Sequence, residues 1–315
     1  MVWGMLSGSS PPCSPVLNVQ SQAREWLEAQ LWPNGPVCPH CGVREASTAI
    51  VTRAGWYQCN SCRKQFSVTV GTLFERSHIP LNKWLMAAFL ICASKKGMST
   101  RQLHRTLGVS YKSTWFMMHR IREAMREGKL GPLGGAGKFV EADETFTGGK
   151  AKNRAYKAPP PKEPVFALVE RGGKVRSYHV PEVTAVTLKP IIVDAIAKNS
   201  HFRTDESGVY WEVGEQFGSH RTVVHSIGEY VRGDAHTNTI EGYFSIFKRG
   251  IYGVYHHVSQ THLKRYLGEF DFRYNYRTAL GFTDRERATI ALKGIVGKRL
   301  TYRRTRSQAE EAGAA

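Results

Sequence analysis

Two Cys-x-x-Cys pairs stand near the start of the chain, Cys38 with Cys41 and Cys59 with Cys62, and 17 residues (42–58) separate them. Each pair brings two thiolates within reach of one ion, and four thiolates form the tetrahedral set that Zn²⁺ prefers. A redox site would instead have a single pair in a βαβ context. The β-branched and aromatic residues around the pairs predict short strands. We therefore expect a zinc ribbon over residues 31–76, after an N-terminal segment of residues 1–30.

Basic residues outnumber acidic ones, because lysine and arginine total 44 against 26 aspartates and glutamates, for a formal charge of +18. Such a charge favours polyanionic partners, with nucleic acid first and an acidic membrane surface as the weaker alternative. The N-terminus lacks the basic start and long apolar run of a signal peptide, and the apolar run 84–93 is too short to span a bilayer. We expect a cytoplasmic, nucleoid-associated protein without a membrane partner.

A helical hydrophobic period begins at Leu81. After it, a short helix ending at Leu107, a Gly-Val-Ser turn and a second helix from about Ser110 follow in order. Two short helices joined by a glycine-containing turn predict a helix-turn-helix DNA-binding domain over residues 77–128. An ordinary three-helix packing unit is the alternative. Glycines concentrate over residues 129–138, which we interpret as a linker.

The first turn of a recognition helix makes base contacts. We assign these contacts to four adjacent residues: Tyr111, Lys112, Ser113 and Thr114. Basic side chains of the same helix pair are assigned to phosphates: Arg101, Arg105, Lys112, Arg120 and Arg122.

Three acids fall at matching places in the second half of the chain. A strand carries Asp143, a second strand ends on Asp205, and a helix carries Glu241; a hairpin and a further helix lie between the first two. The order strand, strand, strand, helix, strand, helix is typical of an RNase H-like α/β fold, which we place at residues 139–296. In that order the three acids converge at one edge of the sheet.

Three carboxylates supply the hard oxygen ligands that hold two Mg²⁺ or Mn²⁺ ions for phosphoryl transfer on DNA. Lys248 lies two helical turns after Glu241, where it would hold a phosphate near the metals. A lone acid is usually solvated, and we interpret four neighbouring acids in that way: Glu141, Glu144, Glu206 and Asp234.

The chain resembles the ISXO-type insertion-sequence transposases, which join a zinc ribbon to an RNase H-like DDE domain. The resemblance extends over about residues 25–295 and is carried by these segments: CPHCG, WYQCNSCRKQFSVTVGTLF, EADETFTGGK, FRTDES, HTNTIEGYFSIFKRGIYGVYHHVS and HLKRYLGEFDFRYNYR. It implies metal-dependent cleavage at the ends of a mobile DNA element and joining of the freed 3′ hydroxyl to target DNA.

The resemblance also assigns the metal ligands. By position, Asp143 and Asp205 match the first two ligands. The third is either Asn238 or Glu241, because members of this group have an asparagine or a glutamate there. We prefer Glu241, since a carboxylate binds magnesium better than an amide does and 35 residues separate it from Asp205.

Residues 253–277 follow the third acid and contain three histidines, three arginines, one lysine and six aromatic residues. We expect a loop at residues 255–257 and then a helix whose apolar stripe, which includes most of the aromatic residues, is core. Its remaining basic side chains are candidates for DNA contacts, together with neighbours on either side: Arg249, His256, His257, Lys264, Arg265, Arg273 and Arg277. A proline-rich loop would add Lys150, Lys152 and Arg154, and residues 297–315 form a basic tail.

These features together predict an enzyme, a DDE transposase that recognises double-stranded element ends and then cuts and joins DNA. Because two ends must be brought together, we expect a homodimer or a higher oligomer on DNA. Two alternatives are a transposase-derived DNA-binding regulator without cleavage activity and an RNase H-like nuclease that cuts without joining.

Overall fold

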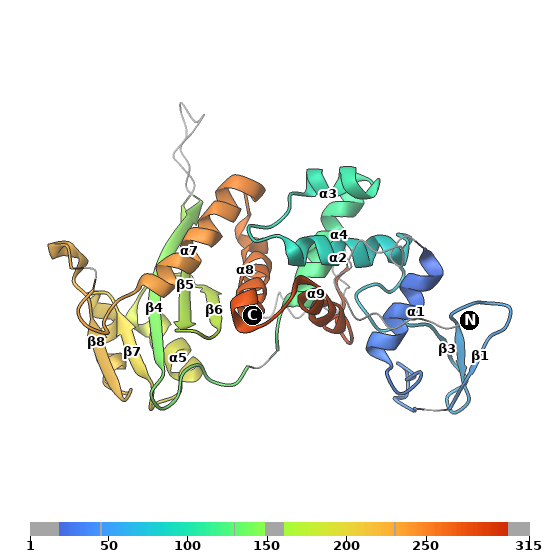
Figure 1. Cartoon of the computed structure of the whole chain (residues 1–315), viewed down its shortest axis with the longest axis horizontal. Helices are drawn as coiled ribbons and strands as arrows, with labels where there is room; N and C mark the ends of the chain where they lie inside the picture. Colours follow the sequence, from blue (N-terminus) through green and yellow to red (C-terminus); the bar gives the residue numbers. More distant parts are fainter. Residues whose placement is uncertain (1–18, 45, 129, 149–160, 230, 302–315) are drawn as a thin grey trace. The chain divides into compact units, whose positions relative to one another are not determined.

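The computed structural model describes residues 19–44, 46–128, 130–148, 161–229 and 231–301. They form two compact units (Figure 1). The ribbon–helix unit comprises residues 19–93, 100–124 and 284–301, and the sheet unit comprises residues 94–99 and 125–283. Within the described residues, no helix combines the length and apolar character needed to cross a membrane.

The ribbon consists of three short antiparallel strands in the order β1 (Ser47–Ala49), β2 (Tyr57–Cys59) and β3 (Gln65–Phe66). Aromatic rings of Trp32, Tyr57 and Phe66 pack on one another beside the cysteines. Helix α1 (Gln20–Leu31) precedes the strands, and the Tyr57 hydroxyl donates to Glu28 of α1 over 3.2 Å. The run after β3, which we expect to be β-rich, consists mainly of turns.

Four helices complete the ribbon–helix unit: α2 (Leu81–Ala93), α3 (Thr100–Leu107), α4 (Tyr111–Met125) and α9 (Asp284–Lys293). Gly108 has a φ of +59° between α3 and α4, a backbone conformation that glycine adopts at little cost. Helix α9 packs on α2, and Arg287 of α9 donates to the Cys92 carbonyl over 2.9 Å. The chain therefore returns to the first unit after residue 283, whereas we expect residues 284–296 in the catalytic domain.

The sheet unit is built on five strands: β4 (Phe139–Gly148), β5 (Lys162–Glu170), β6 (Val175–His179), β7 (His201–Thr204) and β8 (Ser219–Thr222). Their order is β6-β5-β4-β7-β8. Strands β4, β5 and β6 are antiparallel neighbours, while β4, β7 and β8 run parallel. Helix α5 (Ala185–Ala195) provides the crossover from β6 to β7, as the predicted order requires. Short helical turns follow β7 and β8: η2 (Gly208–Tyr210), α6 (Trp211–Gly214) and η3 (His225–Ile227).

Each face of the sheet has its own core. Val140 and Ala142 of β4 belong to the core that includes α5, whereas α7 (Asn238–Gly250) and α8 (Gln260–Asn275) cover the opposite face (Figure 1). Because side chains alternate along a strand, Glu141 and Asp143 lie on the α7 face. A π-helical turn (Ile251–Tyr255) extends α7 as far as the first residue of the expected loop 255–257, and η5 (Thr278–Leu280) follows α8.

The glycine-rich segment before β4 is packed against the sheet unit. Leu133 is buried and forms a parallel bridge with Ile196, and the Gly135 N–H donates to the Ser200 hydroxyl over 2.9 Å. Backbone hydrogen bonds therefore fix this part of the segment that we interpret as a linker.

Candidate active site

Three acids from three elements lie close enough to interact: Asp143 in β4, Asp205 directly after β7, and Glu241 in the first turn of α7. Burial and, after it, the negative charges of Glu144, Asp205 and Glu241 together raise the pKa of Asp143 to about 7. The parallel pairing of β4 with β7 places the first two acids on adjacent strands.

Local hydrogen bonds orient each of these carboxylates. Asp143 accepts from the Glu144 N–H over 2.7 Å, and Asp205 accepts from the Ser207 N–H over 3.1 Å. The hydroxyl of Thr237, one residue before α7, donates to Glu241 over 2.9 Å. These hydrogen bonds partly fix the orientation of the three carboxyl groups.

The donor chemistry suits hard divalent cations, because carboxylate oxygens are the ligands that Mg²⁺ and Mn²⁺ prefer. Among the described residues, four cysteines form a group whose ligand atoms all lie within 4.8 Å of one another, and the three acids do not form such a group.

Three of the acids that we interpret as solvated are engaged. Glu141 has no exposed surface and accepts hydrogen bonds from α7, and Asp234 pairs with Arg203 and Arg221. Glu144 accepts a hydrogen bond from the Tyr210 hydroxyl, and burial followed by the Asp205 charge raises its pKa. The solvated interpretation is wrong for Glu141, which has no exposed surface, whereas Glu144 is half-buried and Asp234 stays partly exposed while it pairs with two arginines.

Asn238, Lys248 and Arg249 are exposed on α7. Asn238 begins the helix one turn before Glu241, so both face the same side as the sequence predicts. The Arg249 guanidinium donates to the hydroxyl and carbonyl oxygens of Ser245.

The four ribbon cysteines form a compact ligand set. The sulfurs of Cys38 and Cys62 are 3.7 Å apart, and those of Cys41 and Cys59 are 3.6 Å apart. The N–H groups of Cys62 and Ser61 lower the pKa of Cys59 to about 7, which favours the thiolate. This set fits the tetrahedral coordination of Zn²⁺, as the spacing predicts.

The recognition-helix candidates differ in exposure. Tyr111 is 46% exposed, Lys112 is exposed and Ser113 is half-buried. Thr114 is wrongly placed among the base contacts, because it is fully buried and its hydroxyl donates to the Val109 and Ser110 carbonyls.

Two further arginines of α4 are engaged within the ribbon–helix unit. Arg120 is half-buried and donates to the Leu300 carbonyl over 3.1 Å, so the C-terminal segment already occupies part of its hydrogen-bonding capacity. Arg122 is buried, and its assignment to phosphate is therefore wrong.

In the sheet unit, His256, His257 and Lys264 are exposed and Arg265 is half-buried beside His262. Arg273 is buried and pairs with Glu269, so it does not contact phosphate. Arg277 donates to the Gly173 and Tyr274 carbonyls. Lys150, Lys152 and Arg154 lie outside the described residues, as does most of the predicted basic tail.

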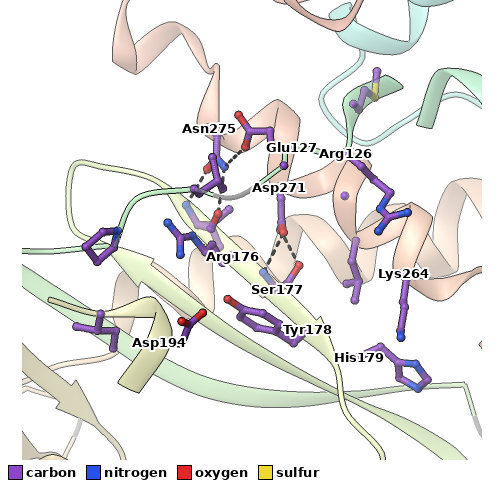
Figure 2. A pocket seen from close by; sticks show the side chains of 18 of the residues that line it. Arg126, Glu127, Arg176, Ser177, Tyr178, His179, Asp194, Lys264, Asp271 and Asn275 are labelled. Carbon is purple, nitrogen blue, oxygen red and sulfur yellow. Dashed lines mark hydrogen bonds between the residues drawn. The ribbon is translucent and has the colours of Figure 1, made fainter. Parts of the chain in front are cut away.

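A separate cavity of about 870 Å³ lies beside β6 and α8 (Figure 2). Asn275 pairs with both the N–H and the carbonyl of Val175, and Asp271 accepts from the Ser177 N–H and hydroxyl. These bonds occupy outward-facing backbone groups of an edge strand, which would otherwise be open to another strand. Lys264 lines this cavity from α8.

Comparisons with known proteins agree with this organisation. Residues 132–275 match the model of the ISXO2-like transposase domain, and residues 20–65 match the model of the transposase zinc-ribbon domain. The two domains define a transposase. The chain is also 31% identical over 274 residues to an uncharacterized protein in transposable element ISH50 of Halobacterium salinarum, a match that covers 78% of this chain and 88% of the relative. The chain belongs to the ISXO2-like transposase family.

Proposed function

We propose that this transposase is a DDE enzyme that cleaves DNA at the ends of an insertion sequence and joins the freed 3′ hydroxyl to target DNA. The observation that carries the proposal is the convergence of Asp205, Glu144 and Glu241 on the half-buried Asp143, whose pKa they raise together with desolvation. Acids so close together repel one another, and divalent cations relieve that repulsion. The strand order and the helices on both faces support an RNase H-like fold.

In this mechanism, Asp143, Asp205 and Glu241 would hold two Mg²⁺ or Mn²⁺ ions. When bound, the ions would activate the attacking oxygen and stabilise the leaving oxygen. Thr237 and the N–H groups of Glu144 and Ser207 keep the carboxylates oriented. The exposed Lys248 binds a DNA phosphate beside the acids, and Asn238 is the alternative third ligand.

Recognition of the element ends falls to the ribbon–helix unit. We assign base contacts to Tyr111, Lys112 and Ser113 in the first turn of α4, with α3 and α4 acting as a helix-turn-helix. Arg249, His256, His257, Lys264 and Arg265 contribute backbone contacts along the sheet unit. A dimer or a larger assembly brings two ends together on DNA in the cytoplasm.

The test is a strand-transfer assay with Mg²⁺, in which DNA flanking the gene is the donor and a supercoiled plasmid is the target. The proposal expects nicks at defined end positions and covalently joined products. Cleavage without joining would favour a nuclease. Specific binding of the ends without cleavage would favour a DNA-binding regulator.

A further inference from the structure

Glu141 is the most deeply buried acid near the candidate active site, with no exposed surface. It stands two residues before Asp143 in β4, so both side chains lie on the α7 face of the sheet. One of its oxygens accepts from the N–H groups of Thr239 (2.9 Å) and Ile240 (3.0 Å). These N–H groups belong to the first turn of α7 and have no partner within the helix.

Glu141, and not the N-cap residue Thr237, accepts from N–H groups in the first turn of α7. Thr237 occupies the N-cap position of α7, but its side chain caps no N–H group of the helix. Its hydroxyl donates instead to Glu241 over 2.9 Å. Glu141 of β4 thus makes the hydrogen bonds that an N-cap side chain ordinarily makes. Thr237, the N-cap residue, instead orients Glu241, which we propose as the third metal ligand.

Arg171 fixes the chain that leads into α7. Its Nε donates to Glu141 over 2.5 Å, and its two terminal nitrogens donate to the carbonyls of Asp234 and His236, each over 2.9 Å. Five donors in a planar fork allow one guanidinium to hold a carboxylate and two carbonyls at once, which an ammonium group cannot reproduce.

A second ion pair, between Arg203 of β7 and Asp234, involves the same segment that leads into α7. Arg203 is 1% exposed, faces Glu141 in the β4–β7 register, and donates to the Asp234 carboxylate over 2.5 Å. It stands two residues before Asp205, as Glu141 does before Asp143. The guanidinium groups of Arg171 and Arg203 both lie against the Phe139 ring, 5.0 and 5.1 Å from its centroid.

We propose that Glu141, Arg171, Arg203 and Asp234 form a positioning network that sets the first turn of α7, and with it Glu241, against Asp143 and Asp205. The network rests on the proposed function of those three acids. Glu141 and Arg203 come from β4 and β7, Asp234 from the segment that leads to the glutamate, and Arg171 from the turn that follows β5. A shift of this segment would move Glu241 without moving either aspartate.

The test compares Glu141→Gln with the wild type and with Glu163→Gln. Glu163 is a matched control, because it is a half-buried acid of the same sheet that pairs with His179 of β6 over 2.8 Å. Three quantities are measured on the zinc-loaded full chain: Mn²⁺ affinity by calorimetry, the Mg²⁺ concentration for half-maximal cleavage, and the Kd for end DNA. Loss of an outer partner of metal ligands typically weakens metal affinity or activity by about 10- to 100-fold.

For Glu141→Gln, the network predicts Mn²⁺ binding weakened by about 10-fold or more, a similar rise in the Mg²⁺ requirement, and an unchanged Kd for end DNA. Glu163→Gln is expected to match the wild type. Unchanged Mn²⁺ affinity in a folded Glu141→Gln protein would overturn the proposal and leave Glu141 a purely structural cap.

Two further variants, Arg171→Lys and Asp205→Asn, test the network if Glu141→Gln does not fold and separate the network from the metal site. Arg171→Lys retains a positive charge beside Glu141 but loses the fork that reaches both carbonyls, so it should weaken Mn²⁺ binding even if Glu141→Gln does not fold. Wild-type affinity for Mn²⁺ in Arg171→Lys would contradict the network. Asp205→Asn separates the two proposals: if it abolishes Mn²⁺ binding while the network variants do not weaken it, the metal site stands and the positioning network fails.

Discussion

Glu141 and Arg203 face one another across the parallel strands β4 and β7, and each stands two residues before an aspartate of the candidate active site. Both strands thus show the same pattern, in which a charged residue is followed two positions later by an aspartate. Glu141 pairs with Arg171, which holds two carbonyls of the segment that leads into α7, and Arg203 pairs with Asp234 of that segment. On this face of the sheet, the charged pair Glu141 and Arg203 therefore precedes the acidic pair Asp143 and Asp205 along the two strands.

Replacement of Cys59 by serine should abolish zinc binding and unfold the ribbon, because Cys59 is one of four sulfurs in a single ligand set and small zinc modules fold on the metal. The measurement is zinc content per chain together with protease sensitivity of residues 31–76. Cys92→Ala is the control, since Cys92 is buried in α2 outside the set and should leave zinc content unchanged. Full zinc content in Cys59→Ser would refute the four-cysteine site.

Lys112→Ala should reduce the preference for end DNA over unrelated DNA, because Lys112 is exposed in the first turn of α4. A side chain that reads a base typically supplies about 1–3 kcal/mol of discrimination. Competition binding measures the ratio of the two affinities. Arg105→Ala, which removes an exposed cation from α3, should weaken both affinities alike. Equal losses for Lys112→Ala would make Lys112 a phosphate contact.

The pH dependence of stability should contain a contribution from Asp271. Burial raises the pKa of Asp271 from 3.8 to about 6, although Ser177 and Tyr243 donate hydrogen bonds to it. A raised pKa means that the folded state favours the protonated acid, so this contribution is full below pH 3.8 and is lost as pH rises through about 6. The total change is at most about 3 kcal/mol in the free energy of unfolding.

Asp271→Asn should therefore flatten the dependence of the unfolding free energy on pH between about 4 and 6. Denaturant unfolding at several pH values measures it. Asp194→Asn removes an exposed acid that lines the same cavity (Figure 2) and should leave the slope unchanged. Equal slopes in Asp271→Asn and the wild type would mean that Asp271 titrates alike in both states.

The third metal ligand can be assigned by comparing Glu241→Gln with Asn238→Ala. Glu241 contributes to the negative field at Asp143, and a carboxylate binds Mg²⁺ better than an amide does. Cleavage by Glu241→Gln should fall to background, while Asn238→Ala should retain measurable activity. The reverse order of activities would identify Asn238 as the ligand.

Short sequence patterns predict much of the fold. The Gly-Gly turn at residues 172–173 joins β5 and β6, and the apolar stripe in residues 253–277 gives the buried Leu263, Tyr266, Leu267 and Phe270 of α8. Both features rest on contacts between residues near in sequence. The spacing of the acids also anticipates their convergence on Asp143.

Features that depend on partners far away in the sequence cannot be predicted from such short patterns. Glu141 looks like a surface acid until Arg171 and Thr239, 30 and 98 residues away, are placed beside it. Thr114 looks like a polar contact residue, although its hydroxyl turns back to the carbonyls of its own turn. A buried charge therefore has no local signature that distinguishes it from a solvated one.

The central claim, that Asp143, Asp205 and Glu241 form one catalytic metal site, is tested most directly with Asp205→Asn. The measurement pairs Mg²⁺-dependent cleavage of end DNA with the Kd for the same DNA. Because Asn keeps the shape of Asp but removes its charge, the account predicts that cleavage is lost while the Kd stays within about 2-fold of the wild type. Wild-type cleavage by Asp205→Asn would contradict the account.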